Sequence, residues 1–192
     1  MTSSQWLRKP VVVVLGHVDA GKTSLLDKIR GTAVQVREAG GMTQHIGASF
    51  FPTETLLQIC GPLLQKVGGS IKVPGLLVID TPGHEAFSNL RSRGGSAADI
   101  AILVVDITRG FEAQTYESVE ILSHRRVPFV VALNKIDRLP GWRSTSTPYL
   151  TESLKKQDKA VLEELDARIY SVVGSLSRLG FRSEAYYRVK DF

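Results

Sequence analysis

Cysteine is almost absent from this sequence, and so are long apolar runs. Cys60 is the single cysteine among 192 residues, which argues against an internal disulfide or a cysteine-based metal site and fits a reducing compartment. No apolar run approaches the ~20 residues that a membrane-spanning helix needs. The segment from Met1 to Pro10 also lacks the apolar core of a signal peptide. We therefore expect a cytoplasmic protein with no membrane partner.

The composition is otherwise that of an ordinary globular protein. Hydrophobic residues make up 43% of the chain and charged residues 22%. A chain of 192 residues is long enough for one domain with a full core. The net charge of +5 is mildly basic, which is compatible with a nucleic-acid neighbour but does not establish one.

One motif organises the chain: Gly16 to Thr23 reads GHVDAGKT and fits the phosphate-binding pattern G-x-x-x-x-G-K-[ST]. Val11 to Leu15 precedes it as an apolar, mostly β-branched run that predicts a strand buried on both faces. Lys22 to Arg30 predicts the following helix, with Gly31 as its stop. A plain strand-to-helix turn is the competing interpretation, and the flanking strand and helix argue against it.

The chemistry of such a loop follows from its geometry. Successive backbone N–H groups and the positive end of the helix surround a polyphosphate. Lys22 is expected to reach the β- and γ-phosphates, and the Thr23 hydroxyl to ligate Mg²⁺. The expected phosphate-binding residues of the loop are Val18, Asp19, Ala20, Gly21, Lys22, Thr23 and Ser24.

The segment after the phosphate-loop helix predicts a nucleotide-sensing loop, then a strand and a helix. Residues 31 to 47 contain four glycines and predict a loop, in which Thr43 could bind Mg²⁺ and the γ-phosphate while a triphosphate is present; a plain surface loop is the alternative. Ser49 to Glu54 predicts an edge strand, because Pro52 cannot donate to a ladder. Thr55 to Val67 predicts an amphipathic helix interrupted by its Gly-Pro pair, with a structural or partner-binding role.

A second phosphate-side motif follows the strand predicted over Gly75 to Ile79. Asp80 stands where a strand beside the phosphate loop ends, a position from which a carboxylate can hold Mg²⁺. Gly83 can offer its N–H to the γ-phosphate, and His84 can point at the attacking water. A capped turn would explain the four residues alone, and their place one strand beyond the phosphate loop favours the functional interpretation. Ala86 to Arg93 predicts a short helix.

The segment Asn134-Lys135-Ile136-Asp137 predicts which nucleotide base is bound. It stands at the end of a strand predicted over Val127 to Leu133. Guanine presents two adjacent donors, and the Asp137 carboxylate can accept both, whereas adenine would leave it unpaired. Asn134 can bond the carbonyl side of the base and brace the phosphate loop, and the aliphatic stem of Lys135 can cover one face of the ring.

Strands and helices alternate along the chain, with a further strand predicted over Asp99 to Asp106 and a helix over Ala113 to Arg125. This alternation predicts an α/β fold of the P-loop NTPase type. It would be a three-layer sandwich with a mostly parallel sheet and one antiparallel edge strand. Ligand would bind at the carboxyl ends of the strands, where every motif falls.

Beyond Asp137 the chain turns helical. Thr147 is a suitable N-cap and Pro148 a suitable first helical residue. Apolar residues then recur at helical spacing up to Gly180 and predict one long helix or two in tandem. Gly180 to Phe192 is basic and aromatic, and a connector is the preferred interpretation over a binding patch.

Together the segments GHVDAGKT, GGMTQHIGAS, DTPGHEAF and NKID resemble the translational GTPases. Within that family, EAGGMTQHIGA and DTPGHEAFSNLRSRG resemble the GTPase domain of the initiation factor that joins ribosomal subunits, called factor two in bacteria and factor five-B in archaea and eukaryotes. The inserted helix and the long helical region after NKID are similar to the archaeal and eukaryotic branch.

The resemblance implies a ribosome-stimulated GTPase that uses Mg²⁺ and turns GTP into GDP. His84 would become productive only against an RNA loop of the large subunit, with Val18 and Met42 as the apolar residues that flank its path. We further hypothesise that Asp19 holds a monovalent cation, K⁺ or Na⁺. Other initiation factors are possible partners, and initiator tRNA would be contacted only through domains absent from this sequence.

The sequence departs from the family at its end, since the fifth guanine-binding motif and the last strand and helix of the domain are missing. We therefore expect residues 1–192 to be an incomplete GTPase domain, with residues 138–192 as a family-specific helical extension within it. One alternative is a truncated, non-catalytic fragment that keeps the fold but binds nucleotide weakly. Another is a GTPase with a target other than the ribosome.

Overall fold

A single mixed sheet forms the centre of the computed structural model, which describes residues 8–36, 44–45, 48–66, 69–80, 98–147 and 149–189. Its six strands lie in the order β2-β3-β4-β1-β5-β6. The strands are β1 (Val11–Leu15), β2 (Gln44–His45), β3 (Ala48–Pro52), β4 (Gly75–Asp80), β5 (Ile100–Asp106) and β6 (Phe129–Asn134).

Four neighbouring strands run parallel, and the strands at one end run against them. β1 pairs in parallel with β4 and β5, and β5 with β6. β3 pairs antiparallel with β4, and the two-residue β2 pairs antiparallel with β3. The expected α/β fold with a mostly parallel sheet is confirmed. β3 was expected to be the edge strand, and this is wrong because the short strand β2 lies outside it. Two residues of β2 pair with two residues of β3.

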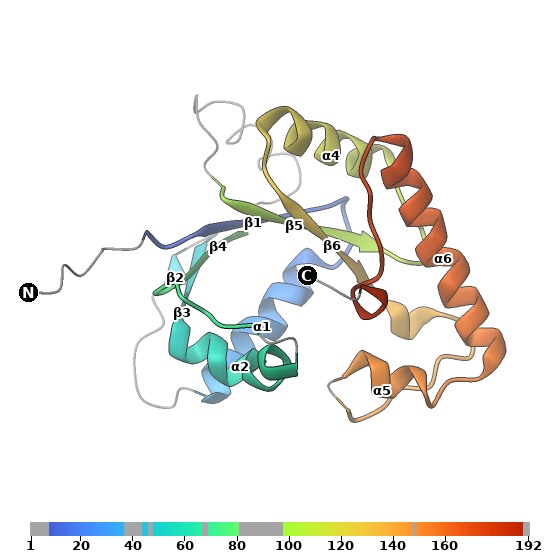
Figure 1. Cartoon of the computed structure of the whole chain (residues 1–192), viewed down its shortest axis with the longest axis horizontal. Helices are drawn as coiled ribbons and strands as arrows, with labels where there is room; N and C mark the ends of the chain where they lie inside the picture. Colours follow the sequence, from blue (N-terminus) through green and yellow to red (C-terminus); the bar gives the residue numbers. More distant parts are fainter. Residues whose placement is uncertain are drawn as a thin grey trace, which may run out of the picture.

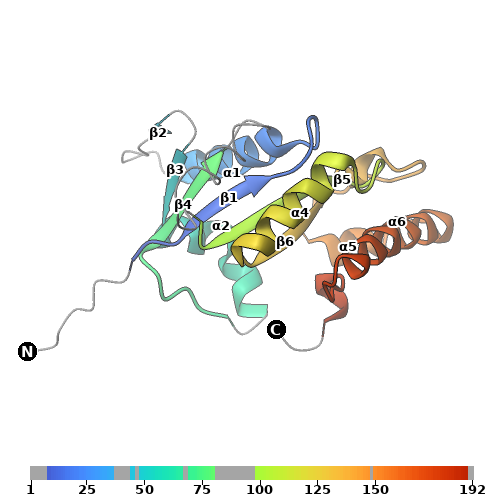
Figure 2. The same ribbon diagram turned by 90° about the horizontal axis from the view of Figure 1, so that it is seen from above.

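Helices cover both faces of the sheet, as Figures 1 and 2 show. Val12 and Val14 point to the face covered by α1 (Lys22–Val36) and α2 (Thr53–Lys66), where Leu26 and Phe51 are also buried. The alternate residues Val13 and Leu15 join the core on the face of α4 (Ala113–Arg125) and α6 (Lys159–Arg178). β1 is therefore buried on both sides, as its unbroken apolar sequence predicts.

Two helices run through the residues that were expected to stop or interrupt them. α1 continues past Gly31 to Val36, and α2 runs unbroken through Pro62. A proline in a helix interior costs about 3 kcal/mol and a glycine about 1 kcal/mol. Burial of apolar side chains offsets such costs, since each fully buried one contributes about 1.5–3 kcal/mol. In α2, Leu56 and Ile59 pack against the buried cluster beneath the sheet.

Beyond Asp137 the chain forms two helices in tandem, α5 and α6, which was one of the two arrangements that the sequence predicted. α5 (Leu150–Leu154) begins after Tyr149, so the expected start at Thr147 is wrong. The Thr147 hydroxyl accepts a hydrogen bond from the Tyr149 N–H at 3.3 Å and donates one to Glu152 at 2.6 Å. Pro148 lies outside the described residues. No helix in the described part of the chain is long and apolar enough to cross a membrane.

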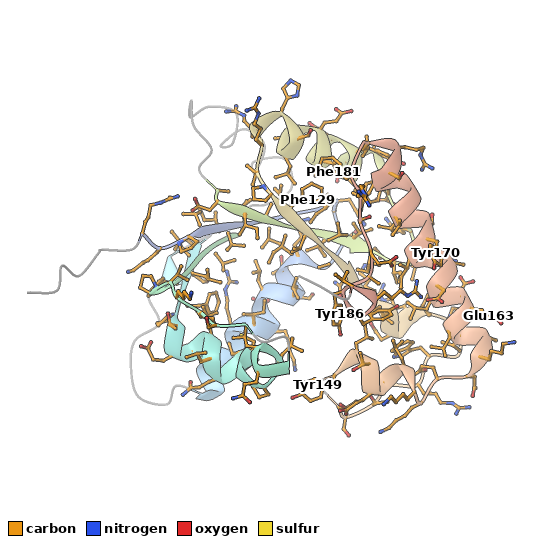
Figure 3. The ribbon with its side chains drawn as sticks, in the orientation of Figure 1. Phe129, Tyr149, Glu163, Tyr170, Phe181 and Tyr186 are labelled. Carbon is orange, nitrogen blue, oxygen red and sulfur yellow. The ribbon has the colours of Figure 1, made fainter. Side chains whose placement is uncertain are left out.

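The segment after α6 returns to the sheet. Phe181 packs edge-to-face on Phe129 of β6, with ring centroids 5.1 Å apart (Figure 3). The 3₁₀ helix η2 (Tyr186–Arg188) then places Arg188 against α6, where its guanidinium pairs with Asp166 and lies over the ring of Tyr170. The preference for a connector over a binding patch in this segment stays a prediction.

Candidate phosphate and base site

The phosphate loop joins β1 to α1 at the carboxyl edge of the sheet. Gly16 has φ 147° and Gly21 has φ 93°, values that favour glycine. A Cβ at Gly16 would overlap the carbonyl oxygen of Val104 in β5, and a Cβ at Gly21 would overlap the side-chain amide of Asn134. Both glycines are therefore required by close packing as well as by backbone conformation.

Lys22 lies over the concave side of this loop. Its ammonium group donates to the carbonyl oxygens of Gly16 at 2.9 Å and His17 at 2.7 Å. The cation is thus held at the centre of the loop, in the position from which it can meet a phosphate oxygen. Thr23 and Ser24 follow at the start of α1, and both are exposed.

The NKID segment lies against the opposite side of the same loop. The Asn134 side-chain amide donates to the carbonyl of Ala20 at 2.9 Å, which is the expected brace. Lys135 has φ 64°, and its ammonium group donates to the carbonyl of Asp19 and to the carboxylate of Asp106. Asp137 lies in the 3₁₀ helix η1 (Ile136–Arg138) with its side chain exposed.

Asp106 is a member of this site that the sequence analysis did not identify. It ends β5, is 2% exposed, and accepts hydrogen bonds from the backbone N–H and the hydroxyl of Thr108 at 2.9 and 2.6 Å. Burial alone would raise its pKa, but the hydrogen bonds and charge from Lys135 and the bonds from Thr108 lower the pKa to about 2. An acidic residue at the end of a buried strand was the signal that could have identified it.

A second contact that the sequence did not reveal holds the first half of the phosphate loop against α4. His17 is 1% exposed, and its Nδ1 lies 3.0 Å from the carboxylate of Glu112, the residue before α4. The Gln114 side chain accepts a hydrogen bond from the N–H of Val18 at 3.0 Å. The Val18 residue itself is 52% exposed.

A polar cavity of about 550 Å³ is bordered by the phosphate loop, the turn after β5 and the segment after β6. It is lined by Asp19, Gly21, Lys22, Thr23, Ser24, Asp106, Thr108, Arg109, Lys135 and Arg138. A larger and more apolar groove of about 700 Å³ runs between β6 and α6. The smaller cavity is the better candidate for an anionic ligand, because its lining supplies cations and the N-terminus of a helix.

Met42, Thr43, Gly83 and His84 lie outside the described residues. Asp80 ends β4 opposite Val14 of β1, which puts its backbone at the same edge of the sheet as the phosphate loop. The described residues contain no cluster of three or more histidine, cysteine, aspartate or glutamate side chains that could hold a metal ion. Mg²⁺ at phosphate sites needs only one or two protein ligands.

Comparisons with known proteins agree with this geometry. The family model of the elongation factor Tu GTP-binding domain matches residues 8–184. The chain is 59% identical over 189 residues to a probable translation initiation factor IF-2 of Thermofilum pendens, covering 98% of this chain and 31% of that protein. It is 57% identical over 191 residues to the corresponding factor of Methanopyrus kandleri, covering 99% and 32%.

A solved structure shows the same fold. The crystal structure of GDP-bound aIF5B from Aeropyrum pernix matches with a TM-score of 0.88 and 56% identity, over 97% of this chain and 31% of that one. The chain thus spans about a third of the length of the relatives it matches. On these matches, the chain belongs to the family of the elongation factor Tu GTP-binding domain, and the relatives it resembles over nearly its whole length are IF-2 and aIF5B initiation factors.

Proposed function

We propose that this domain binds GTP and hydrolyses it to GDP. The observation that supports the proposal is the hydrogen bond from the Asn134 side chain to the phosphate loop, beside a cavity that is lined both by loop residues and by Lys135. In this proposal the loop residues Val18 to Ser24 surround the phosphates, with Lys22 on the β- and γ-phosphates.

Guanine specificity is assigned to Asn134, Lys135 and Asp137. The exposed Asp137 carboxylate accepts both adjacent guanine donors, and a base without that donor pair leaves it unpaired. The stem of Lys135 covers one face of the ring, while its ammonium group stays engaged below the phosphate loop.

The residues of the domain fit a magnesium ion that neutralises phosphate charge. The Thr23 hydroxyl, at the N-terminus of α1, and Asp80, at the end of β4, would hold it, with Thr43 joining in the triphosphate state. Asp19 has φ 64° and lines the cavity, and we assign the monovalent cation site to it. Hydrolysis that is equally fast with and without potassium would exclude that assignment.

Hydrolysis itself is assigned to His84, which orients the attacking water. Val18 and Met42 would flank its approach, and the 52% exposure of Val18 leaves that residue available at the mouth of the site. Gly83 would donate its N–H to the γ-phosphate and carry the switch segment. The stimulus would be an RNA loop of the large ribosomal subunit.

The whole factor would act in the cytoplasm as a timer for ribosomal subunit joining, with GTP binding committing the step and hydrolysis releasing the factor. Relatives named as initiation factors support this role. In this proposal residues 1–192 are a GTPase domain, and residues 138–192 are its helical extension. Other initiation factors are possible partners, and initiator tRNA would bind through other domains.

The test is GTP hydrolysis with and without ribosomes, measured together with GDP affinity for the wild type, Lys22→Ala and His84→Ala. We expect ribosomes to stimulate wild-type hydrolysis, Lys22→Ala to lose binding, and His84→Ala to keep binding while losing stimulation. Tight GDP binding with hydrolysis that ribosomes do not change would favour a target other than the ribosome. Weak binding without hydrolysis would favour a non-catalytic fragment.

A further inference from the structure

The ammonium group of Lys135 lies between two partners from different parts of the chain. One is the backbone carbonyl of Asp19 in the phosphate loop, and the other is the carboxylate of Asp106, 2.6 Å away. Both side chains are largely withdrawn from water, with exposures of 15% for Lys135 and 3% for Asp106. A charged hydrogen bond in such a site is stronger and more directional than one at the surface.

The Asp106 carboxylate is itself held in one orientation. Its Oδ1 accepts both hydrogen bonds from Thr108, which leaves Oδ2 directed at the Lys135 ammonium. The backbone carbonyl of Asp106 accepts from the N–H groups of Arg109 and Gly110 at 3.1 and 2.8 Å, so the turn that carries the carboxylate is closed. The acceptor for Lys135 is therefore oriented by groups of the protein itself.

We propose that Asp106 is a positioning residue for guanine-nucleotide binding, which acts by fixing Lys135 beneath the phosphate loop. Lysine has three rotatable donors on a flexible stem, so the Asp19 carbonyl alone leaves its path undetermined. With Asp106 as the second anchor, the stem crosses the cavity in one direction and presents a fixed wall for the base. The same ammonium ties the base-reading loop to the phosphate loop, so both halves of the ligand meet a preformed site.

This inference rests on the proposed function, and it differs from a merely structural ion pair in what it predicts. If the Asp106–Lys135 ion pair were only structural, its removal would lower the free energy of unfolding and leave the nucleotide affinity of the folded protein unchanged. A positioning pair changes nucleotide affinity, and only through Lys135. Loss of a charge-assisted hydrogen bond at the site corresponds to roughly a tenfold weaker affinity.

The experiment measures the Kd of fluorescent GDP for the full chain as wild type, Asp106→Asn, Lys135→Met and the double variant. Asp158→Asn is the matched control, because Asp158 forms an ion pair with Arg143 at 2.7 Å on the exposed side of the molecule. We expect Asp106→Asn to weaken GDP binding about tenfold, Asp158→Asn to leave it unchanged, and Asp106→Asn to add nothing in the Lys135→Met background.

Thr108→Val provides a milder variant in case Asp106→Asn does not fold. It keeps the carboxylate and removes one of the hydrogen bonds that orient it, so we expect a severalfold loss of GDP affinity that disappears in the Lys135→Met background. Unchanged GDP affinity in Asp106→Asn or Thr108→Val, or an equal loss with and without the Lys135 ammonium, would overturn the inference. A wild type that binds no GDP would instead overturn the proposed function.

Discussion

At the residue scale, the lowered pKa of Asp106 makes the stability of the domain depend on acid. The pKa is about 2 in the folded protein and about 3.9 in an unfolded chain. Because the folded value is the lower one, the stabilisation is complete above about pH 5 and is lost as the pH falls from there through about 2. The shift corresponds to about 2 kcal/mol of unfolding free energy.

We therefore expect the wild type to lose about 2 kcal/mol more stability than Asp106→Asn between pH 5 and pH 2. Urea unfolding curves at several pH values would measure the difference, and Asp158→Asn serves as the control for a carboxylate in an exposed pair. Parallel pH profiles for the wild type and Asp106→Asn would show that the folded-state pKa is not depressed.

Gly21 gives a second prediction at this scale. Its φ of 93° and the Asn134 amide beside it leave no place for a methyl group, so Gly21→Ala is expected to lose roughly 2–4 kcal/mol of stability and most GDP affinity. Gly174→Ala in α6 is the contrasting control, because its nearest neighbour would be Arg178 at 3.9 Å. That change is expected to stabilise by about 0.5–1 kcal/mol, as read from thermal unfolding. Equal effects of the two substitutions would contradict the packing argument.

The residues of the proposed nucleotide site could be predicted from the sequence, because a guanine nucleotide would dictate their chemistry and spacing. Lys22 and Asp137 could be named from short motifs, and the Asn134 brace followed from the shared edge of the sheet. The partners of His17 and Lys135 could not be named, since Glu112 and Asp106 become their neighbours only after β5 and α4 are in place.

At the scale of elements, α6 contacts the turn that borders the proposed nucleotide site. Arg168 donates to the backbone carbonyl of Thr108 at 3.0 Å and pairs with Glu164 one turn earlier. The turn from Asp106 to Gly110 is therefore fixed from outside the site by a helix that contributes no residue to the cavity.

We expect Arg168→Ala to weaken GDP binding about twofold, which corresponds to a loss of about 0.5 kcal/mol at a half-exposed contact. The measurement is the dissociation rate of fluorescent GDP after chase with unlabelled nucleotide. Lys159→Ala, which removes a solvent-exposed pair with Glu163 on the same helix, should leave the rate unchanged. If GDP dissociated from Arg168→Ala at the same rate as from Lys159→Ala, the contact of α6 with Thr108 would not contribute to nucleotide binding.

Element type was predictable and element ends were less so. Unbroken apolar runs identified β1 and β5, because both faces of these central strands are buried. A similar run identified β6, although this strand lies at the end of the described sheet and its Val130 is 54% exposed. Gly31 and Pro62 were expected to end or interrupt their helices, but both helices continue through them. Helix-propensity differences of about 1–3 kcal/mol are outweighed by packing of the helix against the sheet. The start of α5 was misplaced because the Thr147 hydroxyl bonds to Tyr149 and Glu152 instead of capping the helix.

At the scale of the whole molecule, the parallel strands bring segments that are more than 100 residues apart to one edge. β1 ends at the phosphate loop, β5 ends at Asp106 and β6 ends at Asn134, and these three strands lie side by side (Figures 1 and 2). A ligand that bridges these ends should hold the sheet's loops together, so binding and folding are linked.

We expect GDP at a hundred times its Kd to raise the unfolding free energy by about 2.7 kcal/mol. The same concentration of ADP should have no effect, because the Asp137 carboxylate would remain unpaired against adenine. Thermal unfolding with each nucleotide and Mg²⁺ measures this. Equal stabilisation by both would mean that the phosphates alone are recognised.

The most direct measurement is the preference of the site between GDP and its xanthine counterpart, XDP, in the wild type and in Asp137→Asn. Xanthine carries an oxygen where guanine carries the amine, so an amide at position 137 can donate to it while a carboxylate cannot. We predict that the wild type prefers GDP by at least about a hundredfold and that Asp137→Asn prefers XDP. An unchanged preference in Asp137→Asn would show that the base is read elsewhere, and that the phosphate loop and the NKID segment do not form one guanine-nucleotide site.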